Sequence, residues 1–172
     1  MGSYLADTNL LLRLADPDSE QHAVATLALA RLLGQGDKVY LTPLNFIEFW
    51  AVATRPVEGN GFGWTSERTA KEVADLQERF PMLPDSPEVF TRWLELLQRF
   101  PVRGKLVHDA RLVAVLQAHA VEHLITFNTA DFAAFSFLSL IAPHHLVNTP
   151  KRITRTLPCQ RSTMNSTRGG YP

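Results

Sequence analysis

The stretch that decides the fold is VHDARLVAVLQAHAVEHLITFNTADFAAF, which spans residues 107–135. Its pattern predicts a helix over residues 108–121, a short strand over 123–126 and one further helical turn over 130–135. A longer helix that leads directly into a short apolar strand is typical of βαβ units, in which the strands run parallel. The stretch therefore predicts an α/β fold.

The rest of the chain repeats this alternation of short apolar runs and longer helical patterns. We expect further strands over residues 3–6, 38–42 and 137–141, and further helices over residues 7–14, 16–36, 43–55, 66–80 and 86–100. From Pro143 onward no periodic pattern continues. We therefore predict a single α/β domain over residues 1–149, with a central, mostly parallel sheet flanked by helices. Residues 150–172 are expected to form a basic, flexible tail.

Composition limits the classes of protein to consider. A chain of 172 residues with 45% hydrophobic residues can build one domain with a substantial core. It has no run of about 18 apolar residues, so no membrane helix is expected. Asp7 interrupts the N-terminus too early for a signal peptide. The single cysteine, Cys159, cannot form an internal disulfide, which fits a cytoplasmic protein.

The formal net charge of zero conceals an uneven distribution along the chain. No Asp or Glu follows Asp131, whereas five basic residues do: Lys151, Arg152, Arg155, Arg161 and Arg168. Binding to phosphates depends on local charge rather than on the total. The neutral total therefore does not exclude a nucleic-acid partner.

Four acidic residues occupy positions that a parallel sheet would bring together: Asp7, Glu48, Asp109 and Asp131. Ligands of open α/β sheets bind at the carboxyl ends of the strands. Carboxylates gathered there repel one another and tend to protonate unless a cation is present. Their oxygen atoms suit Mg²⁺, with Mn²⁺ as a plausible substitute. Taken singly, helix capping explains the three aspartates and a solvent-facing helix position explains Glu48.

Three segments in this order, LADTNLLL (5–12), NFIEFWAVATRP (45–56) and the stretch at 107–135, resemble the PIN-domain ribonucleases. Within that family they are similar to the VapC-type toxins of bacterial toxin–antitoxin pairs. The resemblance runs from about residue 3 to about residue 143. Its most specific part is the pattern T-x-N-x-x-D-F, which begins at Thr126.

The resemblance implies which residues act. Asp7, Glu48, Asp109 and Asp131 match the family's catalytic, metal-binding acids, and Thr8, Asn9, Thr126 and Asn128 match polar positions around the metal or the substrate. Some PIN domains carry the fourth acid where Asn128 stands, so either Asp131 or Asn128 can be the nearer metal contact.

The resemblance implies a Mg²⁺-dependent endoribonuclease that cleaves RNA and acts as a toxin. It also implies a cognate antitoxin as partner and a homodimer as the assembly. One alternative is a catalytically silent PIN-like module that binds RNA or protein. Another is a different Mg²⁺-dependent phosphoryl-transfer enzyme, such as a phosphatase. None of the four lysines lies in a motif for such an enzyme, and there is no glycine-rich phosphate loop.

Other residues are weaker candidates. His108 is expected to be structural or to support the acids, and the pair His144–His145 is expected to lie in a solvated turn. Candidate phosphate contacts are Arg13, Arg55, Arg103, Lys105 and Arg111. Most of the aromatic set is expected in the core, with some members available for a dimer seam or an antitoxin groove: Phe46, Phe49, Trp50, Phe62, Trp64 and Phe80.

Overall fold

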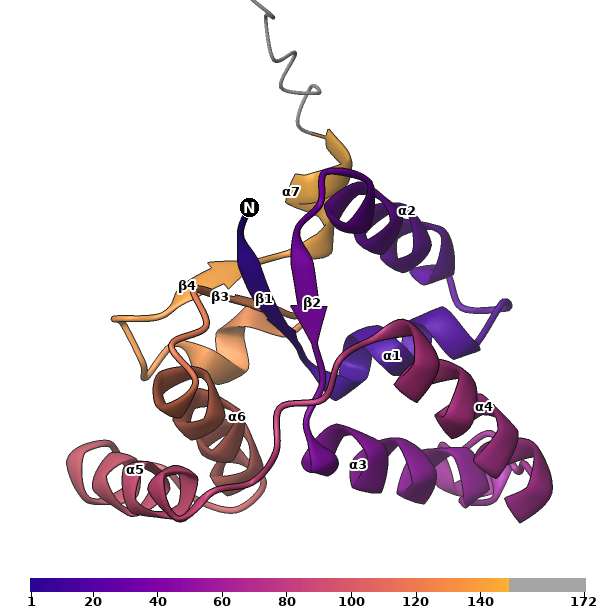
Figure 1. The fold of residues 1–172 in the computed structure, drawn as a ribbon. Coiled ribbons are helices and arrows are strands. Elements are labelled where there is room, and N and C mark those ends of the chain that lie inside the picture. Colours follow the sequence, from indigo (N-terminus) through magenta and orange to yellow (C-terminus); the bar gives the residue numbers. More distant parts are fainter. Residues whose placement is uncertain (149–172) are drawn as a thin grey trace, which may run out of the picture.

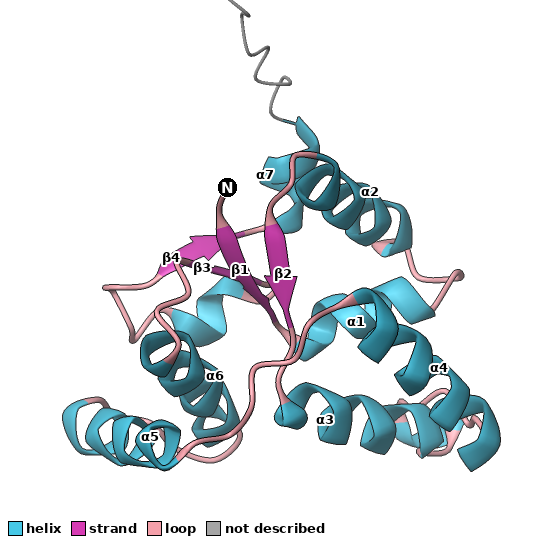
Figure 2. Cartoon of the chain, viewed as in Figure 1, coloured by secondary structure: helices cyan, strands magenta, loops and turns pink. Residues whose placement is uncertain are grey.

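A computed structural model describes residues 1–148 of the chain and contains, within them, a four-stranded sheet (Figures 1 and 2). The strand order is β2-β1-β3-β4, and every pairing is parallel. The strands are β1 (Ser3–Ala6), β2 (Lys38–Tyr40), β3 (His123–Ile125) and β4 (Ser139–Ile141). The predicted α/β class is confirmed, and the sheet is parallel throughout.

Seven α-helices and two 3₁₀ turns connect and flank these strands in the described part of the chain. The helices are α1 (Thr8–Ala15), α2 (His22–Gly34), α3 (Pro43–Thr54), α4 (Ser66–Arg79), α5 (Pro87–Arg99), α6 (Leu106–Ala118) and α7 (Pro143–Asn148). The 3₁₀ turns are η1 (Val57–Gly59) and η2 (Thr129–Phe132).

Both faces of the sheet are buried. Successive side chains of a strand point to opposite faces, and Leu5 and Ala6 accordingly belong to different core clusters although each is fully buried. One cluster packs the sheet against α1 and α2, and the other packs it against α5 and α6. Because both faces are covered, even these short strands are apolar on both sides.

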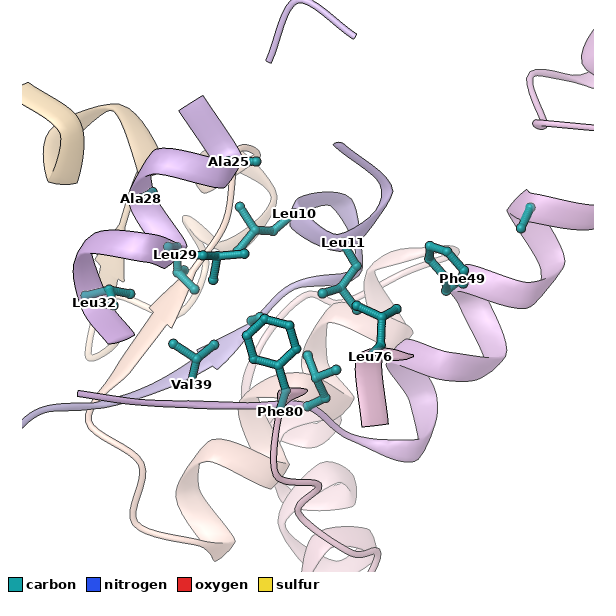
Figure 3. Packing of buried hydrophobic residues seen from close by; sticks show 14 residues of the cluster. Leu10, Leu11, Ala25, Ala28, Leu29, Leu32, Val39, Phe49, Leu76 and Phe80 are labelled. Carbon is teal, nitrogen blue, oxygen red and sulfur yellow. The ribbon is translucent and has the colours of Figure 1, made fainter. Parts of the chain in front are cut away.

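The cluster on the α1 face fixes the direction in which α1 leaves the sheet. Leu10 and Leu11 of α1 are fully buried, and Figure 3 shows them among Leu29 of α2, Leu76 of α4 and the ring of Phe80. This packing positions the first turn of α1, which begins directly after β1.

Capping residues start three helices where the sequence predicts helix starts. The Thr42 hydroxyl accepts from the backbone N–H of Asn45 at 3.3 Å, with Pro43 at the first helical position. The Ser86 hydroxyl starts α5 in the same way. The cap of α4 is Thr65, not the predicted Ser66, because the Thr65 hydroxyl is the group that accepts from the third residue of the helix.

The structure corrects two helix predictions near the C-terminus. Helix α6 spans Leu106–Ala118 instead of residues 108–121, because the chain reverses at Ala120, whose φ is +52°, and Val121 N–H closes back onto the Leu116 carbonyl at 2.9 Å. Helix α7 has no counterpart among the predicted elements. It packs on α2, where Arg31 donates to the Leu146 carbonyl at 2.7 Å. The tail predicted for residues 150–172 lies outside the described residues.

None of the helices within residues 1–148 is both long and apolar enough to cross a membrane.

Two leucines of α2 provide a matched test of the core. Leu29 is 2% exposed and Leu27 is 55% exposed on the same helix. We expect Leu29→Ala to lower the free energy of unfolding by about 2–5 kcal/mol because it leaves a cavity. Leu27→Ala should change it by less than about 0.5 kcal/mol. Urea denaturation of the two variants measures this difference, and equal losses would contradict the assignment of the core.

Candidate functional site

The centre of the site lies where β1 and β3 end side by side. Asp7 directly follows β1 and Thr126 directly follows β3, and the backbone N–H of Asp7 donates to the Ile125 carbonyl at 3.0 Å. The Thr126 hydroxyl then donates to the Asp7 carboxylate at 2.6 Å, although 119 positions separate the two residues in the chain. Parallel pairing thus brings the first and last of the predicted segments together.

Asn9 connects the same two residues from α1. Its amide nitrogen donates to the Asp7 carboxylate at 2.6 Å and to the Thr126 hydroxyl at 2.9 Å. Its amide oxygen accepts from Phe127 N–H at 3.2 Å, and Asn128 N–H donates to the Thr126 hydroxyl at 2.9 Å. Asp7 stands at the N-cap of α1 but makes no side-chain cap bond. Helix capping therefore does not account for this carboxylate.

Glu48 is held by a second chain of hydrogen bonds. The Thr8 hydroxyl donates to the Glu48 carboxylate at 2.5 Å, and the buried amide of Asn45 donates to the Thr8 hydroxyl and to the Ala6 carbonyl, each at 3.1 Å. His108 Nδ1 lies 3.7 Å from the other Glu48 oxygen. Glu48 therefore faces the site rather than open solvent.

Asn45 belongs to the site although it was not among the predicted site residues. The signal was present in the spacing of Thr42 and Asn45, which matches a capping box. Both hydrogen bonds of that box form, because the Asn45 oxygen also accepts from Thr42 N–H at 2.8 Å. The cap leaves the amide nitrogen of Asn45 free to orient Thr8.

Asp109 and Asp131 complete the group of acids. Asp109 lies in the first turn of α6, and Asp131 lies in η2. Burial, followed by the nearby charges of Asp7, Asp131 and Glu48, raises the pKa of Asp109 to about 7, whereas Lys105 opposes the shift. The Lys105 ammonium is 3.3 Å from the Asp131 carboxylate. The four acids are thus close enough to affect one another electrostatically.

The carboxylate of Asp7 is the most buried of the four acids. Burial is the main cause that raises its pKa, and the charge of Glu48 adds to the shift. The hydrogen bond from Thr126 and the nearby backbone N–H groups of Asn9 and Thr8 act in the opposite direction. The surrounding groups therefore oppose, without cancelling, the rise in the Asp7 pKa that burial causes.

The donor chemistry of the site fits a hard divalent cation. Within residues 1–148, no three His, Cys, Asp or Glu side chains are grouped closely enough to hold a metal ion as they stand. Mg²⁺ nevertheless keeps several of its waters and commonly uses one or two carboxylates directly. Burial and then the mutual repulsion of the acids raise the pKa of Asp109, and a bound cation would relieve the repulsion.

Of the other arginines predicted to contact phosphate, two are paired within the protein and two are exposed. Arg13 donates to the Gln21 side chain at 3.2 Å, and Arg111 forms an ion pair with Asp85 at 2.7 Å. Arg55 and Arg103 are exposed.

The structure also shows where the predicted histidine pair and the aromatic set lie. His144 and His145 are exposed, as predicted, but they lie in the first turn of α7 instead of a free-standing turn, and the His144 ring packs edge-on against Phe127. The aromatic set is mostly core, as predicted: Phe49 and Phe80 are buried, and Phe46, Phe62 and Trp64 pack on the same cluster. Trp50 remains 37% exposed.

The raised pKa of Asp109 predicts how stability without metal depends on pH. The folded state holds a proton at this carboxyl up to about pH 7, whereas an aspartate ordinarily has a pKa of 3.8, so stability should fall as pH rises between these values. Asp109→Asn should flatten this part of the profile and leave the protein at pH 8 at least as stable as the unsubstituted chain. Urea denaturation in EDTA from pH 4 to pH 8 tests this, and a steeper decline in the variant would contradict it.

Comparisons with known proteins identify the family to which the fold belongs. The family model described as PIN domain matches residues 4–138, which is more than half of the chain. Ribonuclease VapC24 of Mycobacterium tuberculosis is 29% identical over 140 residues, which cover 76% of this chain and 90% of that protein.

Two solved structures share the fold. VapBC-1 from nontypeable Haemophilus influenzae superposes with a TM-score of 0.62 at 17% identity, covering 82% of this chain and 98% of the other. A toxin–antitoxin complex from Klebsiella pneumoniae superposes with a TM-score of 0.59 at 22% identity, also covering 82% and 98%. The match of the family model over most of the described residues shows that this chain belongs to the PIN domain family.

Proposed function

We propose that this protein is a Mg²⁺-dependent endoribonuclease that acts as the toxin of a toxin–antitoxin pair. The observation that carries the proposal is the group of four carboxylates, in which burial and then the charges of Asp7, Asp131 and Glu48 raise the pKa of Asp109. Its similarity to Ribonuclease VapC24 supports RNA as the substrate. Its likeness to chains in toxin–antitoxin complexes supports the partner.

The carboxylates have different proposed roles. Asp7 and Asp109 are the direct metal ligands, because Asp7 is held in place by Asn9 and Thr126 and Asp109 has the charged neighbours that a cation would balance. When bound, Mg²⁺ neutralises charge on the phosphate and acidifies a coordinated water. Glu48, fixed by the Thr8 hydroxyl, orients the attacking water.

Asp131 is the proposed fourth acid in preference to Asn128. The carboxylate of Asp131 acts on Asp109, whereas Asn128 contributes its backbone N–H to Thr126. Lys105 pairs with Asp131, but its side chain is 78% exposed, so its ammonium can turn to a phosphate of the substrate. Asn128 then serves to hold Thr126, which in turn holds Asp7.

The substrate class and the partners follow from this proposal. Cleavage of a phosphodiester bond inside an RNA strand requires an accessible RNA backbone, which favours single-stranded or looped RNA. A cognate antitoxin protein would hold the enzyme inactive, and we propose a homodimer as the assembly and the cytoplasm as the location.

One observation favours a second candidate function, that of a catalytically silent PIN-like module that binds RNA or protein. No three metal-ligating side chains in the described part of the chain are already grouped around a common point. Lys105 also supplies one of the acids with a protein counter-charge. Such a module would bind RNA without cleaving it, so a cleavage assay separates the two functions.

Cleavage of RNA should depend on a divalent metal and on the acids. We expect Mg²⁺ or Mn²⁺ to support cleavage and EDTA to stop it. Asp7→Asn or Asp109→Asn should lower the rate by more than about a hundredfold, and Asn9→Ala, which acts through Asp7, by about tenfold to a hundredfold. The exposed Asp75, on α4, supplies the matched control Asp75→Asn, which should retain full activity. Undiminished cleavage after thorough chelation would reject the metal mechanism.

Expression in bacteria tests the proposed role as a toxin. Synthesis of the unsubstituted chain without an antitoxin should arrest growth, because cleavage of cellular RNA would then be uncontrolled. Asp7→Asn should remove the arrest at the same level of soluble protein, measured by growth curves and immunoblotting. If both proteins arrest growth equally, the arrest does not come from the nuclease site.

A further inference from the structure

A cavity of about 290 Å³ lies between α5, α6 and the start of α3, and the proposed mechanism does not use it. Figure 1 shows α5 and α6 packed side by side, with α3 beginning beyond the carboxyl ends of β1 and β2. The lining residues are Leu44, Phe90, Trp93, Val107, His108 and Arg111. Its size is close to the lower end of the range for small-molecule sites.

The cavity directly adjoins the acids. Leu44 precedes Glu48 by one helical turn on α3, and His108 immediately precedes Asp109 on α6. His108 connects the two walls, since its Nδ1 lies 3.7 Å from Glu48 Oε1. A phosphate held at the acids would therefore place the nucleotide attached to it beside this cavity.

The walls of the cavity present aromatic surface. Phe90 is 54% exposed and lies against Trp93, with ring centroids 5.8 Å apart and planes tilted by 33°. Trp93 Nε1–H donates to the Val107 carbonyl at 2.9 Å, which fixes the indole and uses its polar atom. The rings are therefore oriented by contacts within the protein while the Phe90 side chain stays accessible.

The charged and polar groups of the cavity lie on α6. Arg111 lines the cavity, and its guanidinium forms an ion pair with Asp85 at 2.7 Å. The His108 side chain is 56% exposed, and its Nδ1 lies 3.7 Å from Glu48 Oε1. Bases of single-stranded RNA stack on aromatic rings, and the exposed ring of Phe90 offers such a surface in this cavity.

We propose that this cavity binds the nucleobase of the nucleotide next to the scissile phosphate, stacked on Phe90. This inference rests on the proposed function, because it needs RNA at the acids. A base fits better than an apolar side chain of a protein partner, because the polar residues His108 and Arg111 line the cavity together with the aromatic rings, and because its lining residue Leu44 lies one helical turn from Glu48. With the indole N–H already used, binding depends more on stacking than on base identity.

Phe90→Ala tests the proposal against a matched control. Phe137 is 49% exposed and, like Phe90, contacts another ring, but it does not line the cavity. On an RNA oligonucleotide whose cleavage site has been mapped with the unsubstituted protein, Phe90→Ala should raise KM roughly fivefold to a hundredfold. The value of kcat should change less, Phe137→Ala should change neither, and Phe90→Tyr should restore KM.

A series of oligonucleotides, each lacking one base, provides a readout that a structural role of Phe90 would not affect. Binding is measured by fluorescence anisotropy with Mg²⁺ present, on oligonucleotides whose scissile phosphodiester is replaced by a non-hydrolysable phosphonate, so that no cleavage occurs. Removal of one particular base beside the cleavage site should weaken binding to the unsubstituted protein about as much as Phe90→Ala does. The two changes together should cost no more than either alone, because they remove the same contact. Additive losses at every position would overturn the proposal.

The outcomes also separate this inference from the proposed function. If the protein cleaves RNA but Phe90→Ala raises KM no more than Phe137→Ala does, the base site is rejected and the proposed function stands. Binding without cleavage, but with the position-specific loss, would reject the enzyme and support the base site. Absence of both binding and cleavage would reject both. Unchanged RNA affinity together with weaker binding of the antitoxin protein would overturn the proposal and assign the cavity to a protein segment.

Discussion

The hydrogen bond between the Thr126 hydroxyl and the Asp7 carboxylate is the contact on which the rest of the site depends. It can form only because β1 and β3 pair in parallel, with Ala6 opposite Ile125, so that the residue after each strand emerges at the same edge. The two core clusters hold this pairing from both faces of the sheet. A one-residue slip in register would separate the hydroxyl from the carboxylate and would also turn buried side chains outward.

The second constraint is that four carboxyl groups must lie close together and keep their orientation. The structure meets it with donors that carry no charge: Asn9 and Thr126 on Asp7, and Thr8 on Glu48. These groups satisfy the carboxylate oxygens and fix their orientation without bringing a positive charge to them. Lys105 is different, because its charged group binds Asp131 from an exposed position that a phosphate could also reach.

The sequence predicted most of this arrangement because its signals are local. The strands, the starts of α3 and α5, and the acids at strand ends all follow from patterns within a few residues. The role of Asn45 could not be predicted in this way, since its partners Ala6 and Thr8 lie almost 40 residues earlier in the chain. Helix α7 is too short to show a period, and its stability comes from packing on α2. The cavity beside the acids requires three helices that only the tertiary structure brings together.

The contact between Arg31 and the Leu146 carbonyl has a practical consequence for handling the protein. Arg31 lies in the last turn of α2, which leads into the amino end of β2, so the end of α7 is anchored on that side of the sheet. Met1 is 93% exposed on the same side, and Figure 1 shows the N-terminus and α7 near each other. An affinity tag or a surface linkage placed at Met1 would leave the opposite edge of the sheet, with Asp7 and Glu48, facing the solution.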